Sequence, residues 1–274
     1  MNWVFAVMAI AVIGYLLDRE IYFYEGVHLG PRVQAWLYDR WSKKYDEGKR
    51  ASQLRDTEML ARPLLDLLKD IPEPFILDFA TGTGRLSYTL LSQSDFIGHI
   101  IALDLSQGML EQAALKLFGL DAKVELLRHQ ALPLPFPDTA FDVVCCLEVL
   151  ELFPNMDEPL AELTRVLRPG GILLTSRGTE ESGRKAKVKS KPVITLLLEK
   201  YGMTNIQIAV WWKLFDRVIA QKGGVSNLAG ARKLSDVLRC GVCQQTQWTK
   251  EVGALKCRNC GKALPITTAG IVLN

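Results

Sequence analysis

The chain has 274 residues, of which 49% are hydrophobic and 23% are charged, and this balance excludes a disordered chain. The length allows one α/β domain with appended segments. The formal net charge of +3 is too small to indicate a nucleic-acid-binding protein by itself.

Residues 1–20 carry an unbroken apolar run, from Trp3 to Leu17, that ends directly before three charged residues. The run has no polar face, so it predicts a hydrophobic helix; with the residues before it, it reaches about 25 Å, slightly less than a hydrocarbon core of roughly 30 Å. Neither a basic start nor a small-residue cleavage site is visible, which disfavours a secretory signal. We expect a transmembrane helix or anchor that acts through residues 3–17. The alternative is a helix buried against the domain or a partner.

Basic residues follow this run and none precedes it, so the positive-inside rule places the main domain in the cytoplasm. Residues 21–70 then predict amphipathic helices, with a turn at Gly30-Pro31. Tyr38, Trp41 and Tyr45 share one helical face. This face either packs against the domain or covers a ligand, and both roles are compatible.

The stretch from Phe75 to Leu91 passes from an apolar run, through a turn rich in Gly and Thr, into helical spacing. It predicts a strand, a tight loop and a helix. Gly82 and Gly84 allow a sharp turn and the close approach of a ligand to backbone N–H groups. Dinucleotides and S-adenosylmethionine (SAM) both bind to such loops. The dinucleotide fingerprint fails, because Ser87 stands at its third glycine.

A second apolar run ends at Asp104, twenty residues after Gly84. A carboxylate there can accept hydrogen bonds from both hydroxyls of a ribose, which NAD and SAM share. Further apolar runs alternate with helical patterns, and this alternation predicts a parallel, doubly wound sheet whose site lies at the carboxyl ends of its strands. The expected strands are 75–79, 99–104, 123–127, 141–147, 171–176 and a hairpin over 206–222.

Four segments in order, DFATGTG (78–84), LSQGMLEQA (105–113), QALPLPFPDTAFDVV (130–144) and LTRVLRPGGILLTS (163–176), resemble class I SAM-dependent methyltransferases. Within that class they are most similar to the quinone-biosynthesis group. The resemblance implies a Rossmann-like, seven-stranded sheet with an antiparallel last strand in residues 71–222. It also implies that residues 21–70 form a lid over the SAM site.

The resemblance places Asp78 near the methionine end of SAM and Asp104 at its ribose. Gln130 stands where the family usually has an acidic residue for adenine, and its side chain can still accept and donate. Glu148 and Glu151 face the expected substrate side, where a histidine base of the related pattern is replaced by Leu152. No catalytic residue is assigned. The full set of expected cofactor-binding residues is Asp78, Ala80, Thr81, Gly82, Gly84, Asp104, Leu105, Gln130, Ala131 and Glu148.

Residues 236–274 follow an expected linker (223–235) and carry four of the six cysteines in two C-x-x-C pairs separated by thirteen residues. This spacing predicts one structural Zn²⁺ held by Cys240, Cys243, Cys257 and Cys260, and it resembles a zinc ribbon. Metal ligation by thiolates indicates a reducing compartment. Trp248, Lys250, Lys256 and Arg258 give weak support for nucleic-acid contact.

A basic run at 184–191 predicts a solvated loop, or contact with an anionic membrane or substrate. Taken together, the sequence predicts a membrane-anchored SAM-dependent methyltransferase, with its catalytic domain in the cytoplasm, that acts on a small or lipid-like acceptor such as a quinone precursor or a phospholipid. Two alternatives stay open. One is an RNA or protein methyltransferase that uses the zinc ribbon for recognition, and the other is a SAM-binding scaffold without turnover.

Overall fold

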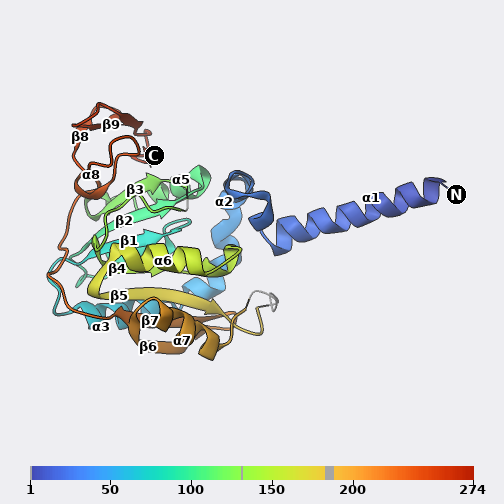
Figure 1. Ribbon diagram of the computed structural model, residues 1–274, viewed down its shortest axis with the longest axis horizontal. Coiled ribbons are helices and arrows are strands. Elements are labelled where there is room, and N and C mark those ends of the chain that lie inside the picture. Colours follow the sequence, from blue (N-terminus) through green and yellow to red (C-terminus); the bar gives the residue numbers. More distant parts are fainter. Residues whose placement is uncertain (1, 131, 183–187) are drawn as a thin grey trace.

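A computed structural model describes residues 2–130, 132–182 and 188–274 (Figure 1). Its centre is an eight-stranded sheet with the strand order β11-β3-β2-β1-β4-β5-β7-β6. Only β7 runs antiparallel to its neighbours, β5 and β6. The strands are β1 (Phe75–Phe79), β2 (His99–Asp104), β3 (Val124–Arg128), β4 (Phe141–Cys146), β5 (Leu167–Gly178), β6 (Met203–Trp212), β7 (Phe215–Lys222) and β11 (Val272–Leu273).

The seven strands expected from residues 71–222 are present, and so is the antiparallel strand at the end of the domain. An eighth strand, β11, comes from the tail and pairs in parallel with β3. The expected start of strand five at residue 171 was wrong. Strand β5 begins at Leu167, where Leu167 pairs with Phe141 and the buried Asp142 accepts a 2.6 Å hydrogen bond from Arg168 Nε.

Helices cover both faces of the sheet, as a doubly wound fold requires. Every residue of β1 is buried, and its side chains alternate between two cores: Phe75 lies in one and Ile76 in the other. One core is covered by α3, α4 and α5, and the other by α6, α7 and α8. These helices are α3 (Arg62–Leu68), α4 (Arg85–Leu91), α5 (Gln107–Lys116), α6 (Asp157–Val166), α7 (Lys191–Lys200) and α8 (Leu234–Val237).

Helix α1 (Asn2–Asp18) projects away from the body of the protein, and its residues from Trp3 onward are exposed (Figure 1). It therefore does not pack against the domain, and of the alternative to an anchor only packing against a partner stays open. Within the described parts of the chain, no helix combines the length and the apolar character that crossing a membrane needs. The transmembrane helix expected for residues 1–20 is thus not found, and membrane contact through residues 3–17 stays a prediction.

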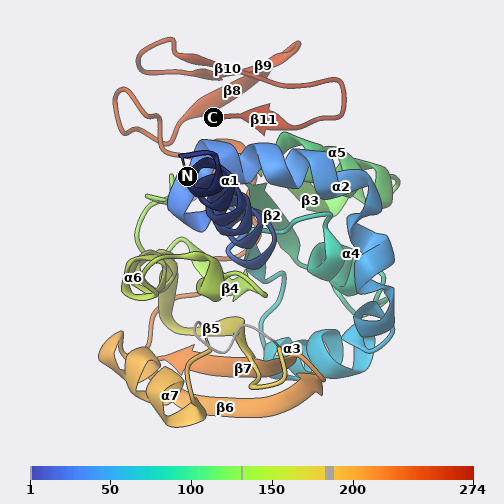
Figure 2. The same ribbon diagram turned by 90° about the vertical axis from the view of Figure 1, so that its right-hand side faces the viewer.

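Helix α2 (Pro31–Gln53) begins after the predicted turn at Gly30 and runs past the carboxyl ends of the strands, the edge that Figure 2 shows from the front. Two short helices, η1 (Arg19–Phe23) and η2 (Val27–Leu29), join it to α1. The expected lid region therefore lies beside the expected site. Of the basic run, Arg184, Lys185 and Lys187 lie outside the described residues.

The tail forms a three-stranded antiparallel sheet of β8 (Trp248–Glu251), β9 (Ala254–Cys257) and β10 (Ala263–Pro265). Its apolar side chains, including Trp248 and Leu255, belong to the same hydrophobic core as β1 and β4. Residues 236–274, which the sequence marks as a separate motif, therefore pack against the central sheet and share its hydrophobic core.

Candidate functional site

The loop after β1 adopts left-handed backbone conformations at three positions: Ala80 (φ 54°), Gly82 (φ 57°) and Gly84 (φ 75°). A Cβ on Gly84 would lie 3.1 Å from the Cβ of Ala113 on α5, so this glycine allows α4 to pack closely on α5. A Cβ on Gly82 would have no described heavy atom within 4 Å. Gly84 thus serves packing, whereas Gly82 leaves open space against the backbone.

Asp78 holds the loop in shape. Its Oδ2 accepts hydrogen bonds from Thr81 Oγ1 and Ser87 Oγ, each at 2.7 Å. Burial raises the pKa of Asp78, and these two hydroxyls oppose the rise by stabilising the carboxylate. The side chain is 3% exposed, so its part in ligand binding acts largely through the loop that it fixes.

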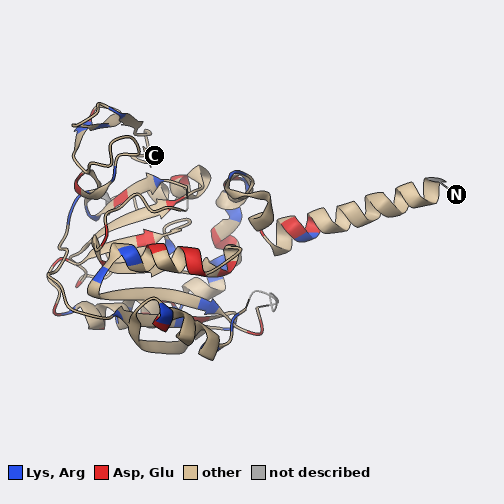
Figure 3. Ribbon diagram, viewed as in Figure 1, with Lys and Arg blue, Asp and Glu red and all other residues tan. Residues whose placement is uncertain are grey.

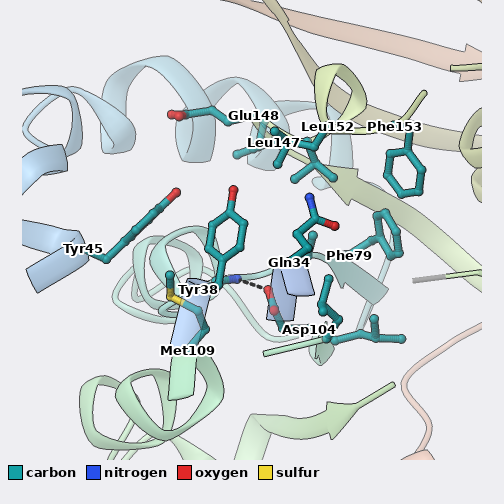
Figure 4. A pocket seen from close by; sticks show the side chains of 15 residues that line it. Gln34, Tyr38, Tyr45, Phe79, Asp104, Met109, Leu147, Glu148, Leu152 and Phe153 are labelled. Carbon is teal, nitrogen blue, oxygen red and sulfur yellow. Dashed lines mark hydrogen bonds between the residues drawn. The ribbon is translucent and has the colours of Figure 1, made fainter. Parts of the chain in front are cut away.

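Asp104 ends β2, and its carboxylate accepts hydrogen bonds from the N–H groups of Gly82 and Ser106, each at 2.8 Å. Burial raises its pKa to about 6, and the backbone donors limit that rise. Each carboxylate oxygen has a second lone pair, so the group can still accept from ligand hydroxyls. It faces a cavity together with Tyr38 and Gln34 (Figure 4).

Two small cavities meet at this loop. The first, of about 80 Å³, is lined by Ala80, Gly82, Asp104, Leu105 and Glu148 together with residues of α2. The second, of about 50 Å³, is lined by Asp78, Thr81, Gly82, Arg85, Glu148 and Trp211, among others. We call them the nucleoside cavity and the amino-acid cavity, after the parts of SAM that they would hold. Neither Gly84 nor the exposed Gln130 is among the described residues that line these two cavities. Ala131 lies outside the described residues.

Glu148 lies between the two cavities in a strained conformation, with φ 60°. Its N–H donates to Ser176 Oγ at 2.6 Å, and its carboxylate pairs with Arg85 at 3.0 Å and with Lys49. A left-handed non-glycine residue costs about 1–3 kcal/mol and persists mainly at functional sites. The geometry therefore supports a role for Glu148 at the site, where the sequence expected it.

Helix α2 closes the nucleoside cavity. Tyr38 and Tyr45 line it (Figure 4), which supports the interpretation of the aromatic face as a cover. Trp41 lines a neighbouring cavity beside Phe215. Ligand pockets usually measure about 300–1,000 Å³. The cavity is therefore smaller than a typical ligand site, and SAM would fit after an outward shift of α2 or of the side chains of Tyr38 and Tyr45.

Two aspartates that sequence reasoning missed hold α2 in this closed position. Asp39 accepts hydrogen bonds from Ser106 Oγ at 2.6 Å and from Gly108 N at 2.8 Å, at the start of α5. Asp46 accepts from Thr83 Oγ1 in the glycine loop at 2.7 Å and pairs with Lys116 at 2.6 Å. On the sequence alone, both residues resemble ordinary polar residues of a helix surface.

The four tail cysteines come together as expected. The Sγ atoms of Cys240 and Cys260 lie 3.5 Å apart and those of Cys243 and Cys257 lie 3.6 Å apart, and all four are within 4.8 Å of one another. Ligands about 2.3 Å from a tetrahedral zinc are about 3.8 Å apart, so the donor set fits Zn²⁺.

Trp248, in contrast, was wrongly expected to be available for nucleic-acid contact. It is 3% exposed, and its Nε1 donates to Leu238 O at 2.6 Å. Its ring therefore belongs to the core and offers no stacking surface.

The strand order, the glycine loop after β1 and the acidic residue at the end of β2 are typical of class I, SAM-dependent methyltransferase domains. Residues 77–175 match the family model of a methyltransferase domain. A solved SAM-dependent methyltransferase from Aquifex aeolicus shares the fold at 24% identity, with a TM-score of 0.55 over 67% of this chain and 97% of that one.

Two curated relatives are named as methyltransferases of quinone biosynthesis. A demethylmenaquinone methyltransferase of Lactobacillus johnsonii is 32% identical over 170 residues, which are 60% of this chain and 65% of the relative. A ubiquinone/menaquinone biosynthesis C-methyltransferase of Francisella tularensis is 35% identical over 128 residues, which are 46% of this chain and 47% of the relative. This chain therefore spans about half to two thirds of the length of these relatives.

Proposed function

We propose that the protein transfers the methyl group of SAM to a lipid-like acceptor of the isoprenoid quinone precursor type. The names of the two relatives support this acceptor class. The observation that carries the proposal is the nucleoside cavity, in which the Asp104 carboxylate and the open backbone at Gly82 lie under Tyr38 and Tyr45.

The residues of the two cavities suit the parts of SAM. Asp104 would accept from the ribose hydroxyls, and Tyr38 and Tyr45 would exclude water once α2 closes. Glu148 and Arg85 offer opposite charges in the amino-acid cavity, where the zwitterionic end of SAM needs both. When bound, SAM supplies an electrophilic methyl group, so the protein has mainly to align the acceptor with it and keep water out.

A membrane location is part of the proposal. Helix α1 projects from the side to which the parallel strands point their carboxyl ends, so an inserted α1 would turn the site toward the bilayer (Figure 1). Figure 3 shows α1 without charged residues except near its junction with the body. Basic residues that follow α1, such as Arg32 and Arg40, favour a cytoplasmic location of the methyltransferase domain.

We also propose that Cys240, Cys243, Cys257 and Cys260 hold a structural Zn²⁺. The geometry of the four sulfur atoms supports this proposal. Four thiolates leave no ligand position open, so the metal would stabilise the tail without taking part in the reaction.

The test supplies the purified full-length protein with labelled SAM and one of three acceptors: demethylmenaquinol in detergent, purified RNA or ribosomal protein. We expect label in the quinol and release of S-adenosylhomocysteine. Asp104→Asn should lower kcat/KM for SAM about 10- to 100-fold, whereas Asp70→Asn, on an exposed residue, should leave it unchanged. Label in RNA or protein alone would contradict the lipid-like acceptor, and SAM binding without any product would favour a scaffold.

A further inference from the structure

A larger cleft, of about 630 Å³, lies next to the base of α1. We call it the α1-base cleft. Its walls come from Tyr24 and η2, from residues of the segment 151–157 that follows β4, and from Lys189 and α7. Its volume lies within the usual range for small-molecule sites.

One wall residue, Glu151, has an incomplete set of hydrogen bonds. The residue is 6% exposed, and its Oε1 accepts from Gly178 N at 2.7 Å. Its Oε2 is buried and has no hydrogen-bond partner in the described part of the chain. Burial raises the pKa of Glu151, which makes its carboxylate a stronger base. A buried carboxylate oxygen without a partner is unfavourable, and a ligand hydroxyl would satisfy it.

The cavity between α2 and β7, of about 240 Å³, differs in this respect. Lys49 pairs there with Glu148, and Tyr38 donates to Glu25. These polar groups satisfy one another. Of the two cavities, the α1-base cleft is therefore the one with an unmet requirement for a hydrogen-bond donor.

Phe153 lines both the cleft and the nucleoside cavity, so this one residue stands between them. Its other flank is apolar and open: Val193 and Leu196 of α7 line it and are 45% and 65% exposed. An amphipathic molecule could therefore place a polar ring near Glu151 and an apolar chain along α7.

We propose that the α1-base cleft binds the methyl acceptor and that Glu151 Oε2 receives the proton of an acceptor hydroxyl. The acceptor is a phenol or quinol ring with an apolar chain. This inference rests on the proposed function and adds the acceptor site and its base to it.

The bonds and protons of the transfer can be followed through the acceptor, SAM and Glu151. The hydroxyl proton moves to Glu151, and the resulting phenolate supplies the electron pair for the new bond to the methyl carbon. The electron pair of the broken S–C bond stays on sulfur, which becomes a neutral thioether. If a ring carbon attacks, the ring becomes a cyclohexadienone, and the proton on the methylated carbon moves to its carbonyl oxygen and restores the hydroxyl. In either case the proton on Glu151 then passes to solvent.

The first test is Glu151→Gln in the full-length protein, with 1,4-naphthohydroquinone bearing one prenyl group as the acceptor. We expect kcat/KM to fall about 100-fold or more, as for the loss of a general base, while the Kd for SAM changes less than twofold. The acid limb of the pH profile should also disappear. Glu158→Gln removes the same charge from an exposed position in the same region and should match the wild type.

The second test is Leu196→Glu, which alters an exposed residue and so leaves folding intact. It should raise the KM for the prenylated ring but not for the ring without a chain. Wild-type kinetics in both variants would overturn the inference, and so would a loss of SAM binding that accounts for the lower rate of Glu151→Gln. Absence of methyl transfer by the wild type itself would overturn the proposed function and the inference together.

Discussion

Replacing Gly108 by alanine tests whether α2 controls access to the SAM site. A Cβ at this position would lie 3.0 Å from both Asp39 Cα and Ser42 Oγ, and 3.1 Å from Asp39 O. Since ordinary contacts begin near 3.4 Å, α2 has to retreat by several tenths of an ångström. That movement lengthens the hydrogen bonds from Ser106 Oγ and Gly108 N to Asp39.

The size of the effect follows from these two bonds. A hydrogen bond to a charged group contributes about 1.5–3 kcal/mol, so weakening the pair should destabilise the closed state by about 2 kcal/mol. The open population then rises roughly 30-fold, because each 1.4 kcal/mol corresponds to a factor of ten. Alanine is also a better helix former than glycine by about 1 kcal/mol, so global stability should change little.

Hydrogen exchange across residues 31–53 and the association rate of SAM measure the opening. Both should increase in Gly108→Ala. The matched control is Gly48→Ala on α2 itself, where a Cβ would have no described heavy atom within 4 Å and only helix propensity changes. Equal exchange and equal association rates in the two variants would show that contact between α2 and α5 does not limit access.

Four further outcomes are expected. Asp104→Asn should weaken SAM binding about 10- to 100-fold in calorimetry, as for the loss of a charged hydrogen-bond acceptor, with Asp70→Asn as the control. Because burial raises the pKa of Asp104 to about 6, wild-type affinity should fall as the pH drops through that value and the carboxylate is protonated, and a flat profile would refute the role. Cys243→Ser should lower bound zinc and the melting temperature; undiminished zinc by elemental analysis would exclude this residue as a ligand. Deletion of residues 1–20 should release the protein from sedimenting membranes, and unchanged sedimentation would count against the anchor.

The sheet could be predicted from the sequence because its central strands are buried on both faces. Strands β1 and β4 consist almost entirely of apolar residues, and such runs stand out between helical patterns. The glycine loop and the cluster of four cysteines could also be predicted, since each depends on residue types at fixed short spacing.

The closure of α2 could not be predicted, because it depends on contacts between distant segments. Asp39 bonds to Gly108 across 69 positions, and nothing near Asp39 in the sequence indicates this partner. The same holds for β11, whose two residues carry no periodic pattern and whose pairing with β3 is set by how the tail packs. Glu151 Oε2, which has no hydrogen-bond partner among the described residues, is likewise recognised only when the neighbouring backbone is in place.

The pairing of β11 with β3 also protects the sheet against aggregation. A bare edge strand exposes unpaired N–H and C=O groups that can template pairing with another molecule. At the opposite edge, β6 has two register irregularities, and a bulged strand is a poor template for a second chain. At the other edge, β11 covers the carboxyl end of β3, where it pairs with Leu127 and Arg128, so any event that detaches the tail would expose this end of the edge to self-association.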